Sequence, residues 1–179
     1  FTNTSNLGTG IATPYFWAIS DDKDITFTPR GYAKENALFL NEYRQAFRNG
    51  FLTLDTSYTP GYSNTSNTKT KGSRNHIFTE LDLNFNQREE RQSSLHLKVQ
   101  RTSNDTYLKK HDINTALVDS DITNLENEIG YNFSNDNSFF DVSASSYENL
   151  DVKKKSDKYE YILPNVTYGK TFFTESFGV

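Results

Sequence analysis

The sequence predicts an all-β fold, an antiparallel up-and-down meander of about nine or ten strands. Apolar and polar side chains alternate along several short runs, clusters of Asn, Asp, Gly and Ser separate those runs, and helical periodicity is almost absent. The chain has 179 residues, of which 15% are aromatic, and its mean hydropathy is -0.76. That aromatic content argues against a disordered chain, and the length suffices for one domain with a core.

The clearest alternation lies between Arg74 and Phe85. Odd positions there are mostly apolar, as at Ile77, whereas even positions include Glu80 and Asp82. Because successive side chains point to opposite faces of a strand, one face would be apolar and the other charged. The same argument predicts strands in residues 51–58, 95–100 and 124–133, and two short β-type runs at residues 14–19 and 24–30 form a predicted hairpin.

Short and long connections alternate along the chain. Short turn signals lie at residues 20–23, 48–50 and 134–137. Longer polar connections occupy residues 59–72, 102–120 and 151–158. Outer-membrane barrels have short turns at one rim and long loops at the other. The sequence contains no run of about 18 apolar residues, so it predicts no membrane-spanning helix. The fold is therefore predicted to be part of a large transmembrane β-barrel, with a soluble β-sandwich or curved soluble sheet as the alternative.

Two features favour the barrel. Charged or titratable side chains occupy the polar positions of the strands, which suits a water-filled lumen. The lumen-facing candidates are Arg44, His76, Glu80, Asp82, His96, Lys98, Glu126 and Glu128. Aromatic side chains gather near strand ends, where the interfacial girdles of a barrel lie. They are Trp17, Phe47, Phe51, Tyr58, Phe85, Tyr131 and Phe133.

The first predicted hairpin carries one proline in each strand, Pro14 and Pro29. Proline cannot donate a hydrogen bond to a neighbouring strand, so it is normally kept out of central strands. Two such defects suit a sheet that opens at a lateral gate, and the alternative is that both are edge prolines that limit aggregation. With a turn from Ser20 to Asp24, paired residue numbers sum to 44. This register pairs Ile19 with Ile25, Trp17 with Phe27, Tyr15 with Pro29 and Pro14 with Arg30.

The sequence carries no convincing catalytic or metal-binding set. Cysteine is absent, and the three histidines, His76, His96 and His111, fall in separate segments without ligand spacing. Neither G-x-S-x-G nor a glycine-rich phosphate loop is present. The net charge of -4 argues against a nucleic-acid partner. We therefore predict that the protein is not an enzyme and holds no cofactor or metal.

The first hairpin also carries a longer motif. Residues 13–19 (TPYFWAI) and 24–30 (DITFTPR) resemble the start of the barrel domain of the LptD family, the lipopolysaccharide-assembly outer-membrane proteins. That family reads approximately P-Y-[YF]-W-x-I and then D-x-T-x-T-P-[RH]. Residues 42–44, 58–60 and 103–112 are similar to later motifs of the family, with an inserted Asn104 and with Asn36 in place of a usual glycine. The matching motif residues are Tyr15, Trp17, Arg30, Asp105, Tyr107 and Asp112.

The resemblance implies transport and insertion of lipopolysaccharide into the outer leaflet of the outer membrane of a Gram-negative bacterium. In that family lipid A passes through a lateral gate beside the first barrel strands, and Pro14 and Pro29 match the gate prolines. Residues 1–179 would then be the first strands of the barrel, a piece of a longer protein that lacks its jelly-roll domain and remaining strands. The implied partners are lipopolysaccharide, the plug lipoprotein LptE and, through the jelly-roll domain, the periplasmic bridge protein LptA.

Two other functions stay open. A general outer-membrane porin or receptor barrel would conduct small solutes without a lipoprotein plug. A soluble adhesin-like β domain would fold without detergent. For a barrel fragment we expect the isolated chain not to fold alone, because an open sheet leaves two unpaired edges.

Overall fold

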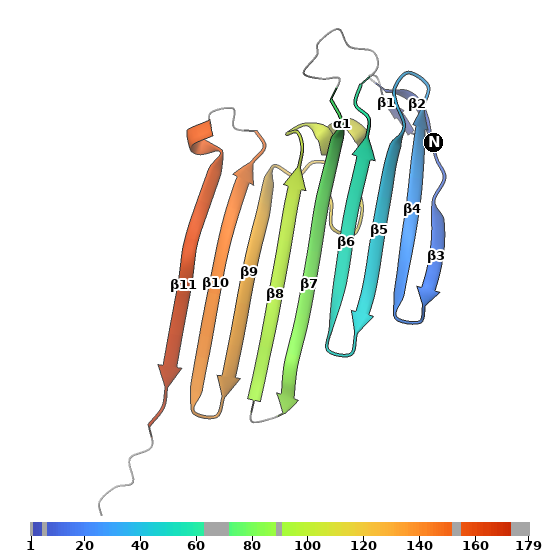
Figure 1. The fold of residues 1–179 in the computed structure, drawn as a ribbon. Helices are drawn as coiled ribbons and strands as arrows, with labels where there is room; N and C mark the ends of the chain where they lie inside the picture. Colours follow the sequence, from blue (N-terminus) through green and yellow to red (C-terminus); the bar gives the residue numbers. More distant parts are fainter. Residues whose placement is uncertain (1, 5–6, 63–71, 89–90, 152–154, 173–179) are drawn as a thin grey trace, which may run out of the picture.

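One antiparallel sheet contains all eleven strands of the described residues (Figure 1). The computed structural model describes residues 2–4, 7–62, 72–88, 91–151 and 155–172. The strands are β1 (Thr2–Thr4), β2 (Gly8–Ala12), β3 (Tyr15–Ser20), β4 (Lys23–Tyr32), β5 (Leu38–Phe47), β6 (Gly50–Thr59), β7 (Arg74–Arg88), β8 (Arg91–Thr102), β9 (Asn124–Asn135), β10 (Ser138–Asn149) and β11 (Tyr159–Lys170). The short helices are α1 (Tyr107–His111) and η1 (Lys155–Asp157). The predicted all-β meander is confirmed, and the two short strands before Tyr15 add to the expected number.

The order of the strands is that of an up-and-down meander. Each strand from β4 to β10 pairs with the strand that follows it in the chain. β2 and β3 both pair with β4, because they are two halves of one strand that is interrupted at residues 13 and 14. β1 pairs with the outer side of β2, so β3 is the half that lies at the free edge. β11 forms the opposite edge, so the described sheet is open (Figure 1). In the part of the chain that the structure describes, no helix is long and apolar enough to cross a membrane.

Short turns and long connections lie at opposite ends of the strands, as the sequence predicts (Figure 1). Two residues, mostly Asp or Asn, connect β3 to β4, β5 to β6 and β9 to β10. Such residues tolerate the backbone conformations that two-residue turns require. Of the predicted long connections, residues 63–71 and 152–154 lie outside the described residues.

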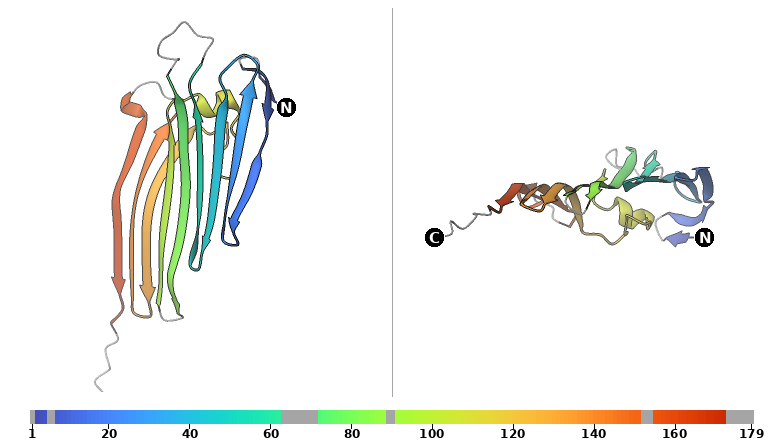
Figure 2. Two further views of the ribbon diagram at one scale, coloured as in Figure 1. Left: turned by 45° about the vertical axis from the view of Figure 1, so that its right-hand side comes forward. Right: turned by 90° about the horizontal axis from the view of Figure 1, so that it is seen from below.

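The β8–β9 connection, residues 103–123, folds against one side of the sheet (Figure 2). Asn104 accepts a hydrogen bond from the backbone N–H of Thr106 (3.1 Å), just before α1 begins. The helix ends at Asp112, whose φ of 48° lies in the left-handed region that Asp adopts more readily than most residues. The sequence predicts a polar loop here. The packing of the segment was not predicted, because its apolar residues follow no strand period.

The main cluster of buried apolar side chains lies under this connection. Its members are Leu38, Leu40, Phe78 and Leu125 from the sheet, Tyr107, Leu108, Ile113 and Val118 from the connection, and Leu150 after β10. Full burial of one leucine or phenylalanine side chain contributes about 1.5–3 kcal/mol. The cluster therefore holds the connection on the sheet, which is elsewhere a single layer in the described residues (Figure 2).

The register of the first hairpin differs from the prediction. Tyr15 pairs with Phe27 and Trp17 with Ile25, so paired residue numbers sum to 42 and not to 44. The turn is tighter than expected, because Asp21-Asp22 alone connects the two strands. A shift of two residues keeps every side chain on its original face, so the shared apolar face of the hairpin was predicted correctly although the partners were not.

Candidate functional site

One face of the sheet, here called the apolar face, is built from the apolar positions of the strands. Cross-strand pairing aligns Leu52, Leu81, Leu97 and Ile129 in one row from β6 to β9. Other members are Tyr15, Trp17, Ile25, Phe27, Phe39, Leu54, Leu83, Leu95, Tyr131, Phe133, Val142 and Tyr168. Several are widely exposed, with 56% of Trp17 and 52% of Ile129 accessible. A contiguous apolar surface of this width indicates contact with a membrane or a protein partner.

The opposite face, here called the polar face, carries the charged positions. One row of paired residues crosses five strand pairs, through Asp24, Arg44, Thr53, Glu80, Lys98 and Glu128. The register places all eight lumen-facing candidates on this face: Arg44, His76, Glu80, Asp82, His96, Lys98, Glu126 and Glu128. The two faces therefore differ in the way that separates lipid from water in a barrel wall.

Opposite charges pair across the strands of the polar face. Arg44 donates through Nε to Asp24 Oδ1 (3.0 Å), and Lys98 donates through Nζ to Glu126 Oε2 (2.8 Å). Ion pairs with this much exposure contribute only about 0–1 kcal/mol to stability. The stability of the fold therefore does not explain so many charges. Contact of this face with water or with a polar solute does explain them.

The two predicted histidines of the polar face have different surroundings. His96 is partly exposed, and its Nδ1 lies 2.6 Å from Asp82 Oδ1. His76 is buried, with Nε2 2.7 Å from Asp55 Oδ1 and Nδ1 2.5 Å from Ser57 Oγ. A Ser–His–Asp chain has the composition of a catalytic triad. Ser57, however, is only 4% exposed, and its hydroxyl is in contact with the Tyr107 hydroxyl of the β8–β9 connection.

Four of the motif residues lie where the β8–β9 connection meets the sheet. The Tyr107 hydroxyl is 2.7 Å from Ser57 Oγ, and burial raises the pKa of this phenol, which stays protonated. Arg30 donates through Nη1 to the carbonyl oxygens of His111 (2.9 Å) and Asp112 (3.0 Å). The first hairpin is thus bonded directly to the connection. The motif residues Tyr15 and Trp17 lie on the apolar face and take no part in this contact.

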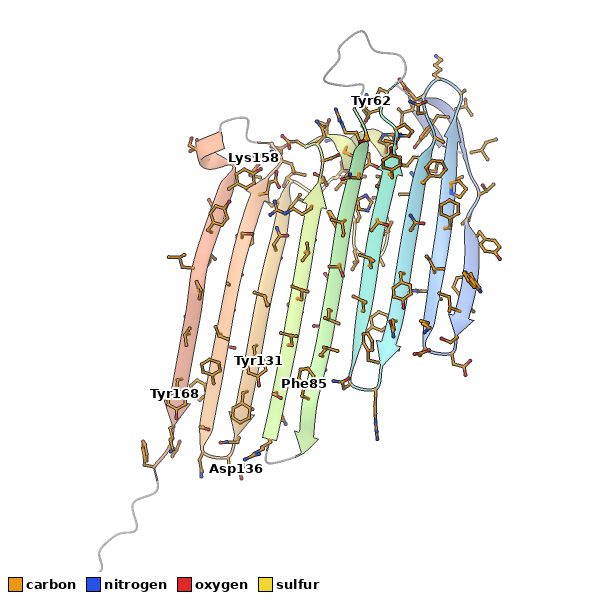
Figure 3. The ribbon with its side chains drawn as sticks, viewed as in Figure 1. Tyr62, Phe85, Tyr131, Asp136, Lys158 and Tyr168 are labelled. Atoms are coloured by element: carbon orange, nitrogen blue, oxygen red, sulfur yellow. The ribbon has the colours of Figure 1, made fainter. Side chains whose placement is uncertain are left out.

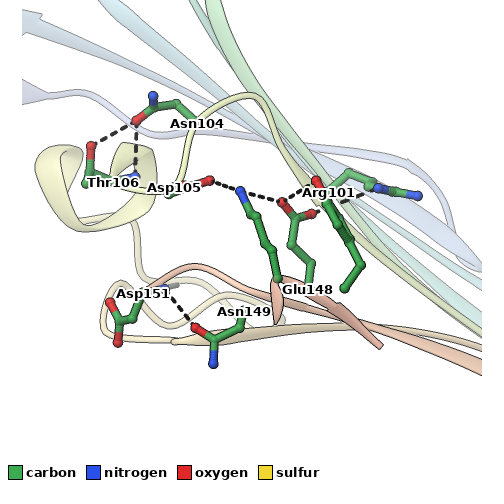
Figure 4. Close-up of polar contacts among 9 residues, drawn as sticks. Arg101, Asn104, Asp105, Thr106, Glu148, Asn149 and Asp151 are labelled. Atoms are coloured by element: carbon green, nitrogen blue, oxygen red, sulfur yellow. Dashed lines mark hydrogen bonds and ion pairs between the residues drawn. The ribbon is translucent and has the colours of Figure 1, made fainter. Parts of the chain in front are cut away.

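Asp105, the fourth motif residue at this junction, holds the start of the connection to the rim of β10 and β11 (Figure 4). Lys158 donates through Nζ to Asp105 Oδ1 (2.6 Å) and to Glu148 Oε1 (3.1 Å). Arg101 Nη1 lies 3.9 Å from Glu148 Oε2. The connection is therefore held at two points, at its start beside β11 and at the end of α1 on β4.

Sequence reasoning missed the role of His111. Its Nε2 lies 3.2 Å from the Tyr62 hydroxyl and its Nδ1 lies 3.3 Å from the Tyr32 hydroxyl. Burial lowers the pKa of His111 to about 4, and the charges of Lys110 and Arg30 act in the same direction. The two tyrosines are 49 and 79 positions away in the sequence, so no local spacing signals the cluster.

The two prolines of the first hairpin remove different hydrogen-bond donors. The pairs on either side of the interruption keep one register, which places Pro14 opposite Thr28 and not opposite Arg30 as predicted. Thr13 donates its N–H to the carbonyl oxygen of Pro29 (3.1 Å). An antiparallel pair of this kind normally exchanges two bonds, and the return bond is missing because Pro29 has no N–H.

Pro14 acts on the other side of the edge strand. Backbone groups of successive residues point to opposite sides of a strand, and those of Thr13 point to β4. The nitrogen of Pro14 therefore lies on the outer edge, where a further strand would pair. One proline weakens the hairpin from within, and the other removes a donor from its free edge.

Aromatic side chains of the apolar face gather toward the end of the sheet that carries the short turns. Phe85, Tyr131 and Tyr168 lie there, on β7, β9 and β11 (Figure 3). Phe51, which the sequence analysis places in a girdle, pairs with Asp82 and so belongs to the polar face. Aromatic side chains near strand ends are typical of the interfacial girdles of barrels.

The fold and site together define a class: an antiparallel sheet with an apolar face, a charged face and a proline-interrupted edge. No family model matches the chain. The chain is similar to the LPS-assembly protein LptD of Nitrosococcus oceani, with 27% identity over 136 residues. The match covers 72% of this chain and 16% of that protein, so the chain spans about a sixth of the length of this curated relative. The relationship is distant and partial, and it points to a transport protein.

Proposed function

We propose that this chain is part of the wall of an outer-membrane β-barrel that inserts lipopolysaccharide into the outer leaflet through a lateral gate beside its first strands. The observation that carries the proposal is the interrupted edge strand. There Pro29 removes a donor inside the hairpin and Pro14 removes one at the free edge. The partial similarity to an LPS-assembly protein supports the same assignment.

The missing donors lower the cost of parting the seam. A typical hydrogen bond contributes about 0.5–1.5 kcal/mol net, and a bond surrounded by lipid is worth more because a freed carbonyl finds no water. The donor missing at Pro14 therefore weakens the seam by roughly 0.5–1.5 kcal/mol, and the donor missing at Pro29 loosens the attachment of the interrupted strand to β4 by a similar amount. The proposed gate positions are Pro14, in the interrupted strand, and Pro29, on the neighbouring strand β4.

The two faces suit the two halves of an amphiphilic substrate. In the proposed barrel the apolar face contacts lipid, and the acyl chains leave through the seam on this side. The polar face lines the lumen and accepts the sugars and phosphates, with the eight candidates from Arg44 to Glu128 along the path. The chain performs no covalent step.

The remaining parts of the proposed assembly lie beyond this chain. Residues 1–179 supply the first strands of the barrel domain, and further strands close it against β11 and the interrupted edge. The plug lipoprotein LptE lies against the polar face, and the bridge protein LptA delivers substrate through a jelly-roll domain. The location is the outer membrane of a Gram-negative bacterium.

The test replaces both prolines by residues that donate. In the full-length protein, Pro14→Val with Pro29→Val tightens the seam, and the arrival of new lipopolysaccharide at the cell surface slows. Pro60→Val, outside the hairpin, is the matched control and leaves delivery unchanged. Heat-dependent migration on a gel reports that each variant is folded. Normal delivery by the folded double variant contradicts the gate.

The same preparation tests the porin alternative. Reconstituted full-length protein with its lipoprotein plug should conduct small solutes poorly. High conductance with no effect of the double variant on lipopolysaccharide delivery would assign the chain to a general porin.

A further inference from the structure

A cavity of about 190 Å³ lies on the polar face between β4, β5 and β6 and the β8–β9 connection. Thr28 and Arg30 line it from β4, Glu42 from β5, Asp55 from β6 and Asn114 from the connection. At about 30 Å³ for each water molecule, the volume equals that of roughly six waters. The cavity therefore has room for one compact polar ligand.

Two buried polar atoms among its lining residues have no hydrogen-bond partner within the described structure. One is Asp55 Oδ2, an acceptor, and the other is Arg30 Nε, a donor. Asp55 is only 1% exposed, and its other oxygen is bonded to His76. Arg30 already uses Nη1 for the connection. Buried polar groups are normally satisfied, so an unpaired donor and an unpaired acceptor on two residues that line the same cavity favour a ligand that both accepts and donates.

The charges select the kind of ligand. Glu42 and Asp55 are direct cross-strand partners, and two neighbouring carboxylates repel an anion such as a free phosphate. The Arg30 guanidinium repels a metal ion, and the described residues contain no group of three or more His, Cys, Asp and Glu suited to one. A hydroxyl group both donates and accepts, so adjacent hydroxyls satisfy the carboxylates and the guanidinium together.

We propose that this cavity binds one sugar ring, which rests on the proposed function and deepens it. The ring hydroxyls donate to Asp55 and Glu42 and accept from Arg30. Thr28 adds a hydroxyl on the wall, and it lies opposite Pro14 on the interrupted strand. The sugar is therefore held directly behind the seam, so that the lipid attached to it is positioned for lateral exit.

The test uses the full-length protein in lipid nanodiscs with a single cysteine in the cavity, Thr28→Cys. This segment contains no native cysteine. The probe is the oligosaccharide that mild acid releases from lipopolysaccharide. It should slow the reaction of Cys at position 28 with a thiol reagent. Glu42→Gln should raise the oligosaccharide concentration needed for this protection about tenfold. Ser143→Cys, on the polar face but away from the cavity, is the matched control and should react at an unchanged rate.

Three outcomes overturn the proposal. They are no protection at position 28, equal protection at position 143, and protection by calcium ions alone, which would make the cavity a cation site. If the protein still delivers lipopolysaccharide but shows any of these results, the sugar site is contradicted and the proposed transport function stands. If position 28 is protected but replacing the prolines does not change lipopolysaccharide delivery, the sugar site is supported and the gate is contradicted.

Discussion

Single backbone groups decide how firmly the first hairpin closes. The N–H of Thr13 reaches Pro29, whereas no N–H returns from Pro29. Pro14 is one position further along, yet its nitrogen lies on the outer edge because strand backbone groups alternate in direction. Two prolines that look equivalent in the sequence therefore act on different pairings.

Replacing each proline separately should distinguish the two roles. Pro29→Val restores a donor to the carbonyl of Thr13, so hydrogen exchange at Thr13 should slow by roughly three- to tenfold. Pro14→Val is the control, because its new N–H lies outside the β3–β4 pairing. Amide exchange followed by mass spectrometry or NMR measures both. Equal slowing of hydrogen exchange at Thr13 in the two variants would contradict the sides of the strand to which we assign the backbone nitrogens of residues 14 and 29.

His111 makes the docking of the β8–β9 connection depend on pH. Its pKa is lowered from 6.5 to about 4 in the docked state, mainly by burial. Docking is therefore at full strength above about pH 6.5 and weakens as the pH falls toward about 4, because only the released histidine takes up a proton. The total loss is about 3 kcal/mol. Proteolysis of the connection should accelerate between about pH 7 and about pH 5.

His111→Gln is the control for this prediction. Glutamine keeps hydrogen-bonding groups near Tyr62 and Tyr32 but has no titrating proton in this range. An undiminished pH dependence in this variant would assign the effect to another group.

At the scale of elements, the β8–β9 connection joins parts of the sheet that are far apart in sequence. Its start is bonded to Lys158 beside β11 and its helix end to Arg30 on β4. Leu108, between those points, and Ile113, just after the second, pack on the sheet. The connection is therefore a brace on the polar face, next to the cavity proposed to bind sugar.

Removing one apolar contact should release this brace. Leu108→Ala deletes a buried side chain and should weaken docking by about 2–5 kcal/mol. Lys109→Ala changes the next residue of the same helix, whose side chain is 77% exposed, and should have little effect. Limited proteolysis of the folded full-length protein distinguishes them. Similar cleavage of both variants would show that the packing does not hold the connection.

At the scale of the whole molecule, the contrast between the two faces decides the environment of the sheet. The apolar face presents rows of leucine and isoleucine, and the polar face presents rows of paired charge. This contrast suits the proposed wall between lipid and water.

A charge should therefore be tolerated on one face only. Ile129→Lys on the apolar face should destabilise the protein in a bilayer by about 2–4 kcal/mol. Ser143→Lys places the same charge on the neighbouring strand, facing the other way, and should be close to neutral. Unfolding of the full-length protein from lipid vesicles in denaturant measures both. Equal effects would contradict a wall between lipid and water.

The sequence by itself determined the class of fold, the two faces and the alternation of short and long connections. These follow from local patterns, because a period of two sets the face of every side chain. A register error of two residues in the first hairpin left the faces unchanged for the same reason.

Only the tertiary structure decided the partners across the hairpin, the sides on which the two prolines act, and the docking of the β8–β9 connection. The contacts of Arg30, Tyr107 and His111 join residues separated by about 50 to 80 positions. Such contacts depend on how the strands are ordered and paired, and no local period encodes them. The cavity beneath the connection exists only because those distant segments meet.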